Sequence, residues 1–249
     1  DNYKVITRTG MVNNHYLAFS GGTPQSNYRA SFGVMDHNTI IKKMDYNVFV
    51  AKVDVTQKAF NDRLTGDFGV FGSSFKNHDI FDTQMLFYSA ACQNPTLPAG
   101  TDENGNWLKN ESATHINPPG IVLDEKNDSK DLNFDAHIKL SYDFNPNWRI
   151  STFASYLCGS TENGMFCPTW VWAQGNVYRG EFKKEEWLGN VALSFNKQIG
   201  IHRISAEASG EYRKLTKTAF WVYAKGIPTN DFGYDNLGAT AARPYGGTE

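Results

Sequence analysis

The chain alternates between apolar and polar residues over long stretches, and the clearest of these is 131–145. Every even position in this stretch is apolar and every odd position is polar. A period of two places the two sets on opposite faces of an extended strand, whereas a helix would scatter both around its axis. The stretch holds 15 residues, while strands of soluble sheets usually have about 5–6. Because a tilted strand needs about 9–11 residues to cross the hydrocarbon of a bilayer, the length favours a membrane-spanning strand.

The same alternation predicts about eight long strands in four hairpins: 13–22 with 26–35, 46–58 with 64–74, 131–145 with 148–157, and 187–195 with 202–212. Four connections are short, at 23–25, 61–63, 146–147 and 197–200, and three are longer, at 36–45, about 75–130 and about 159–184. Tight turns at one end and long loops at the other are typical of outer-membrane barrels. We therefore predict an all-β fold in which residues 1–249 form part of an antiparallel, up-and-down transmembrane β-barrel. Its turns would be periplasmic, its long loops extracellular, and one short helix is expected at 80–91.

In such a barrel the apolar positions face lipid and the alternate positions face the lumen. The residues expected to face the lumen are Arg29, Lys52, Asp54, Asp67, Asp135, His137, Lys139, Arg149, Glu207 and Glu211. Aromatic residues near the strand ends, as in interfacial girdles, are Tyr28, Tyr142, Trp148, Trp187 and Tyr212. The alternative is that the charged face is the solvated surface of a soluble β-sandwich.

The composition narrows the classes of function. The formal net charge is −2, which gives no indication of a nucleic-acid partner. No apolar run approaches the roughly 18–20 residues of a membrane helix, which excludes a helical membrane protein but not a barrel. The chain has no GxSxG, HExxH or P-loop motif, and its six His residues are scattered. We therefore expect no enzyme activity, no cofactor and no metal site.

Two of the three cysteines invite a structural interpretation. No CxxC pair exists, which argues against a structural zinc site. Cys158 and Cys167 are nine positions apart at the expected second long loop. They could form a disulfide if the loop is extracellular, or they could remain separate thiols. Cys92 is left without a partner under either interpretation.

Aromatic residues in the long loops are the candidate ligand contacts: Trp107, Trp170, Trp172 and Tyr178. Aromatic side chains commonly line ligand sites, and here they would stack on sugar rings or grip peptides. The alternative is that they pack the loops against each other or against a partner protein.

Short segments of recognisable sequence follow one another along the chain. They are NHYLAFSGG at 14–22, NYRASFG at 27–33, AKVDV at 51–55, NPTLP at 94–98, DENG at 102–105, Asn117-Pro118, GIPTNDF at 226–232 and YDNL at 234–237. In sequence and order they resemble segments of the SusC/RagA-type TonB-dependent outer-membrane transporters. The resemblance covers about residues 5–240.

The resemblance implies a larger polypeptide with an N-terminal plug domain, a TonB-contacting segment and a barrel of about 22 strands. This chain would be an internal barrel segment, without the plug and the closing strands. The implied function is import of oligosaccharides or peptides across the outer membrane of a Gram-negative bacterium of the Bacteroidetes type. The implied partners are membrane lipid, a SusD-like surface lipoprotein over the barrel, and TonB reached through the plug. The alternatives are a soluble or surface β-sandwich module that binds glycans and an outer-membrane enzyme on a small barrel.

Overall fold

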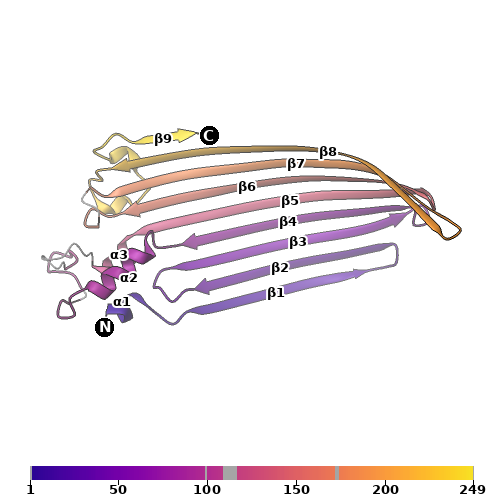
Figure 1. Cartoon of the computed structure of the whole chain (residues 1–249). Helices are drawn as coiled ribbons and strands as arrows, with labels where there is room; N and C mark the ends of the chain where they lie inside the picture. Colours follow the sequence, from indigo (N-terminus) through magenta and orange to yellow (C-terminus); the bar gives the residue numbers. More distant parts are fainter. Residues whose placement is uncertain (1, 99, 109–116, 172–173, 249) are drawn as a thin grey trace.

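The computed structural model describes residues 2–98, 100–108, 117–171 and 174–248. Within these ranges nine strands form one antiparallel sheet, and each strand pairs with its neighbours in the sequence (Figure 1). The strands are β1 (Met11–Gly22), β2 (Ser26–Asn38), β3 (Asp45–Ala59), β4 (Leu64–His78), β5 (Lys126–Asn145), β6 (Trp148–Cys167), β7 (Asn176–Ile199), β8 (His202–Lys225) and β9 (Tyr245–Thr248). The predicted all-β, antiparallel, up-and-down topology is confirmed, and the sheet fits an open segment of a barrel wall.

The two ends of the sheet differ (Figure 1). At one end, hereafter the turn end, short connections join β1 to β2, β3 to β4, β5 to β6 and β7 to β8. At the other end, hereafter the loop end, lie α1 (Asn2–Ile6), α2 (Thr83–Cys92), α3 (Pro118–Asp124) and the 3-10 helices η1 (Asn230–Phe232) and η2 (Leu237–Ala239). None of the described helices has the length and apolar character needed to span a membrane. Short connections thus lie at the turn end and the helices and longer connections at the loop end, which confirms the predicted sorting.

The strands β5 to β8 continue beyond their predicted limits at the loop end. The connection expected at 159–184 spans only 168–175, because β6 and β7 occupy the rest of it. The connection expected at 75–130 narrows to 79–125 and contains α3 and α2, which confirms the predicted helix. This extension could not be predicted from the sequence, because residues 158–164 are polar or small at both odd and even positions. Alternation identifies a strand only where its two faces meet different environments.

The disulfide between Cys158 and Cys167 is not formed, and that alternative was wrong. Both residues lie on β6, where nine residues at about 3.3 Å each place them about 30 Å apart. A disulfide requires the two Cα atoms to lie within about 7 Å of each other. Both cysteines are free thiols, as is Cys92.

Among the described residues, buried apolar side chains gather in two clusters at the loop end. The helix cluster contains Ile6, Ile41, Ile80, Leu86, Ala90, Ile121 and Val122. The tail cluster contains Phe166, Val177, Ala224 and Ile227, with Tyr234 and Leu237 packed against it. The long middle part of the sheet instead leaves its apolar side chains exposed.

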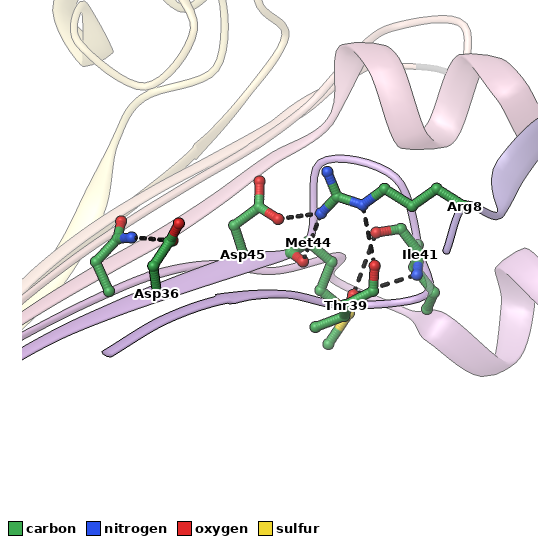
Figure 2. A network of polar contacts seen from close by, with 7 residues as sticks. Arg8, Asp36, Thr39, Ile41, Met44 and Asp45 are labelled. Carbon is green, nitrogen blue, oxygen red and sulfur yellow. Dashed lines mark hydrogen bonds and ion pairs between the residues drawn. The ribbon is translucent and has the colours of Figure 1, made fainter. Parts of the chain in front are cut away.

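Arg8 holds the segment before β1 to the connection between β2 and β3 (Figure 2). Its guanidinium donates from Nε to the carbonyl of Thr39 over 2.9 Å and from Nη2 to the carbonyl of Met44 over 3.2 Å. The same group forms an ion pair with Asp45 at the start of β3. Arg8 thereby ties three points of this tight connection together at the loop end.

Candidate functional site

The register of the sheet brings the apolar positions of its long strands onto one face. One row of directly paired residues runs from β3 to β8 through Val55, Phe68, Ile138, Ala154, Gly189 and Tyr212. Because side chains alternate along each strand, the other predicted apolar positions lie on the same side, which we call the apolar face. Its large exposed side chains include Leu17, Phe19, Phe32, Val34, Phe49, Val53, Phe68, Val70, Leu132, Phe134, Val191 and Leu193. A continuous exposed apolar surface of this kind marks contact with lipid or with another protein.

The upper limit of the apolar face crosses the sheet obliquely. On β3 the continuous run of apolar positions ends toward the loop end at Phe49. On β8 it ends at Tyr212, although Phe220 and Val222 lie farther along the same side. The row that contains Phe49 reaches β8 at Thr218, six residues beyond Tyr212. Six residues correspond to about 20 Å along a strand, and five strand spacings to about 24 Å across the sheet. Between these two ends the limit is inclined by about 40° on average. It is level from β3 to β5, where Phe49 and Leu132 share a row, and the incline falls on β5 to β8.

Aromatic rings lie near both limits of the apolar face. Toward the loop end Tyr156 and Trp187 stack with ring centroids 4.4 Å apart, and toward the turn end Trp148 and Phe195 do so at 4.8 Å. The predicted girdle residues lie on this face by register: Tyr28, Tyr142, Trp148, Trp187 and Tyr212. Amphipathic rings at both limits of an apolar band are typical of the two membrane interfaces.

The opposite side of the sheet, hereafter the polar face, carries all the residues predicted to face the lumen. They are Arg29, Lys52, Asp54, Asp67, Asp135, His137, Lys139, Arg149, Glu207 and Glu211. Many of them pair across strands or along one strand: Lys52 with Asp54 at 2.9 Å, Arg149 with Asp143 at 2.7 Å, and Glu207 with Ser194 at 3.0 Å. Exposed pairs of this kind add little stability. Their effect is to make this face a surface that water wets.

His137 lies flat against β4 on the polar face. A Cβ at Gly69 would come within 2.2 Å of Cε1 of this ring, so the glycine leaves the space that the imidazole fills. The ring of Phe153 lies on the other side, with centroids 6.0 Å apart, and Oδ1 of Asp135 is 3.4 Å from Nδ1. The surroundings are those of a packed polar side chain.

Two of the four candidate aromatic residues meet in the loops. The indole N–H groups of Trp107 and Trp170 both donate to Oδ2 of Asp124, over 2.6 and 3.1 Å. Both rings are half-buried, and Trp170 packs against the helix cluster. This geometry favours loop packing over ligand contact for the two residues.

The other two candidates do not join that pair. Tyr178 lies on the polar face of β7, between Met165 and Tyr223 of the neighbouring strands. Trp172 lies outside the described residues. The four residues predicted as ligand contacts therefore do not form one site in the described part of the chain.

Glu125 is a buried carboxyl group that the sequence did not single out. Its side chain, 4 % exposed, lies between α3 and β5. Oε1 accepts a hydrogen bond from Sγ of Cys167 over 3.4 Å, and Oε2 has no hydrogen-bond partner among the described residues. Burial, reinforced by the nearby carboxylate of Asp82, raises the pKa of Glu125 to about 7. The residue follows an unpatterned loop, so only the fold reveals its burial.

Comparisons with known proteins find two similar sequences among TonB-dependent receptors. No family model matches the chain. It is 26 % identical over 258 residues to the TonB-dependent receptor P3 of Formosa agariphila, covering 96 % of this chain and 25 % of the relative. It is 24 % identical over 250 residues to the TonB-dependent receptor SusC of Bacteroides thetaiotaomicron, covering 86 % of this chain and 24 % of SusC. The chain thus spans about a quarter of the length of these curated relatives.

Solved structures of the RagAB peptide importer share the fold over the whole chain. In the open-open state the TM-score is 0.78 with 14 % identity, covering 100 % of this chain and 29 % of that one. In the closed-closed state the TM-score is 0.76 with 14 % identity, covering 100 % and 30 %. The names of these proteins describe receptors and an importer, in agreement with the prediction that the chain is not an enzyme. These likenesses in sequence and fold support a segment of a SusC/RagA-type TonB-dependent transporter.

Proposed function

We propose that the chain forms part of the barrel wall of a nutrient importer in the outer membrane of a Gram-negative, Bacteroidetes-type bacterium. One observation carries the proposal. A single apolar face backs directly onto a polar face rich in charged residues. A wall with these two surfaces separates lipid from a water-filled or protein-filled interior.

The division of surfaces assigns each face a role in transport. The apolar face contacts lipid tails, and the polar face, with Arg29, Lys52 and Glu207 among its members, lines the interior. A plug domain elsewhere in the polypeptide gates the barrel, and TonB supplies the energy for transport by pulling on that plug. The helices and long connections at the loop end face the outside of the cell, where a SusD-like surface lipoprotein would dock.

The substrate class proposed is oligosaccharides or peptides. SusC among the relatives and the RagAB peptide importer among the solved structures support this range. The second candidate, a β-sandwich module that binds glycans, is weaker. All strands of the described chain belong to one sheet, so this part of the protein contains no second sheet to cover the apolar face.

The test uses the full-length protein expressed in its host with an affinity tag. We expect it in the outer-membrane fraction, extractable only with detergent, and bound to a surface lipoprotein after mild solubilisation. Uptake of labelled oligosaccharides and labelled peptides, compared between the wild type and a deletion strain, identifies the substrate class. A full-length protein that is soluble and monomeric without detergent would overturn the proposal. Normal uptake of both classes in the deletion strain would overturn the substrate assignment alone.

A further inference from the structure

Two lysines face each other at the edge of the apolar face. Lys76 on β4 pairs directly with Lys130 on β5. They follow the paired residues Ser74 and Leu132 toward the loop end and project on the same side of the sheet. Each is the first charged residue beyond the apolar band on its strand. In the proposed barrel this position corresponds to the headgroup region of the outer leaflet.

The lysine pair lacks a balancing partner. Like charges directly opposite each other destabilise a sheet. None of the ion pairs among the described residues includes Lys76 or Lys130. The carboxylate nearest in register is Glu162, opposite Lys130 on β6, and it neutralises at most one of the two charges.

A pocket of about 480 Å³ opens beside the pair, and its lining includes Asn47, Lys76, Lys130 and Glu162. Its remaining charged groups are engaged with one another or with neighbours: Asp45 with Arg8 (Figure 2), Asp128 with His78, and Arg179 with Asp235. Of the charged lining residues outside these pairs, two are lysines and one is a carboxylate, Glu162, so one ammonium group is left without a carboxylate of its own. An anionic group is the ligand that this charge would attract.

The side chains next to the pocket indicate which kind of molecule bears the anionic group. Leu132, in the row below Lys130, and Phe134, in the next row, are 40 % and 43 % exposed on the apolar face. Phe49 lies in the same row as Leu132. A free phosphate ion would leave these side chains unused, whereas a lipid places its phosphate above them and its acyl chains against them.

We propose that Lys76 and Lys130 bind the phosphate of an outer-leaflet lipid whose acyl chains lie along the apolar face below. This inference rests on the proposed function, because it requires the apolar face to meet a bilayer. The bound lipid removes the repulsion between the two ammonium groups and fixes the height of this wall in the membrane.

The experiment compares two double variants of the full-length transporter, purified from outer membranes in mild detergent. The test variant is Lys76→Gln with Lys130→Gln. The matched control is Lys184→Gln with Lys217→Gln, because these lysines also pair directly, but on the polar face. Native mass spectrometry measures how many phosphate-bearing lipids each protein retains, and lipid titration of delipidated protein measures affinity. Unchanged heat-modifiable mobility on gels shows that each variant has folded.

We expect the test variant to bind the lipid about 25-fold more weakly, since each lysine near an anionic lipid surface contributes about fivefold. The control should bind as the wild type does. Equal binding by the wild type and the test variant overturns the inference, as does an equal loss in both variants. Inorganic phosphate is titrated separately, and binding of phosphate as tight as that of the lipid would overturn the lipid assignment. If the wild-type protein is absent from the outer membrane, the proposed function is wrong. This result is distinguishable from wrong assignment of the lipid site, in which the protein is in the outer membrane but the lysine variant binds lipid normally.

Discussion

The phenolic O–H of Tyr234 donates a hydrogen bond of 2.6 Å to Oδ2 of Asp128, which precedes it by 106 residues. The other carboxylate oxygen of Asp128 contacts Nδ1 of His78. The ring of Tyr234 lies over Gly164, where a Cβ would approach it to 2.7 Å, and the Arg179 guanidinium lies 5.7 Å from its centroid. These contacts fasten the segment after β8 to β4–β7, on the side of the apolar face but beyond its limit.

Replacing Tyr234 by Phe is expected to loosen this attachment. The change removes a hydrogen bond to a carboxylate, which contributes about 1.5–3 kcal/mol, while the ring contacts remain. Amide hydrogens at 226–239 should exchange about ten- to a hundredfold faster, as measured by hydrogen–deuterium exchange with mass spectrometry. Tyr212→Phe on the apolar face is the matched control and should leave this exchange unchanged. Equal protection in Tyr234→Phe and the wild type would show that the ring contacts alone hold the segment.

Glu125 predicts a pH dependence of stability at the loop end. Its pKa in the folded protein, about 7, lies above the ordinary value of 4.5. A raised pKa means that burial of the neutral acid stabilises the fold below about pH 4.5 and that this contribution is lost as the pH rises through 7. At 1.36 kcal/mol per pH unit the loss is up to about 3 kcal/mol. The segment 79–125 should therefore exchange its amide hydrogens faster at pH 8 than at pH 5, beyond the intrinsic change in exchange rate.

Glu125→Gln should remove most of that dependence, because a neutral amide occupies the same space at both pH values. At pH 8 the variant is expected to be more protected than the wild type in this segment. Glu103→Gln, at an exposed site in the same connection, is the control and should keep the wild-type dependence. An unchanged pH profile in Glu125→Gln would assign the dependence to another group.

The sequence predicted the parts of this fold in which the two faces of a strand meet different surroundings. Along 131–145 each apolar residue from Leu132 to Phe144 faces one side, so alternation located the strand and the side on which each residue lies. Above the apolar limit the rule fails, because residues such as Ser160 and Glu162 lie on the same side as Leu132 yet are polar. The extension of β6 to Cys167 therefore lies in a stretch that was predicted as a loop.

Candidate contacts in the loops were less predictable for a related reason. The sequence shows that Trp107 and Trp170 are aromatic, but only the fold shows that both donate to the same oxygen of Asp124. Burial of Glu125 likewise depends on the contact between α3 and the end of β6, and no local sequence pattern predicts this contact. Partners separated by long stretches of sequence are set by tertiary packing rather than by periodicity.

Two glycines of β4 should respond differently to the same substitution. A Cβ at Gly69 would lie 2.2 Å from the His137 ring, whereas at Gly72 the nearest atom would be 4.0 Å away. Gly69→Ala should force the imidazole to move and destabilise the sheet by about 1–3 kcal/mol, and Gly72→Ala should be close to neutral. Urea unfolding of the full-length protein in detergent measures both. Adding His137→Ala to Gly69→Ala should restore most of the loss, and failure of this rescue would place the strain in the backbone instead.

Adjacent residues on β7 test which face meets lipid. Val191 lies in the middle of the apolar face, and Asn190 lies on the polar face opposite Glu211. Val191→Arg should cost about 2–4 kcal/mol, because a guanidinium at mid-bilayer depth is poorly solvated. Asn190→Arg should cost little, because its charge meets water and the Glu211 carboxylate. The measurement is the amount of heat-modifiable, folded protein in the outer membrane at equal expression.

The two variants differ by one position and introduce the same side chain, so charge and size are matched and only the face changes. A lower yield for Val191→Arg alone supports lipid on the apolar face. Equal yields would mean that water reaches both faces, which contradicts a membrane wall. A loss for Asn190→Arg alone would reverse the assignment of the faces. Because Val191 is 51 % exposed in this sheet, steric clash cannot account for a loss at that position, and the solvent on the apolar face decides the result.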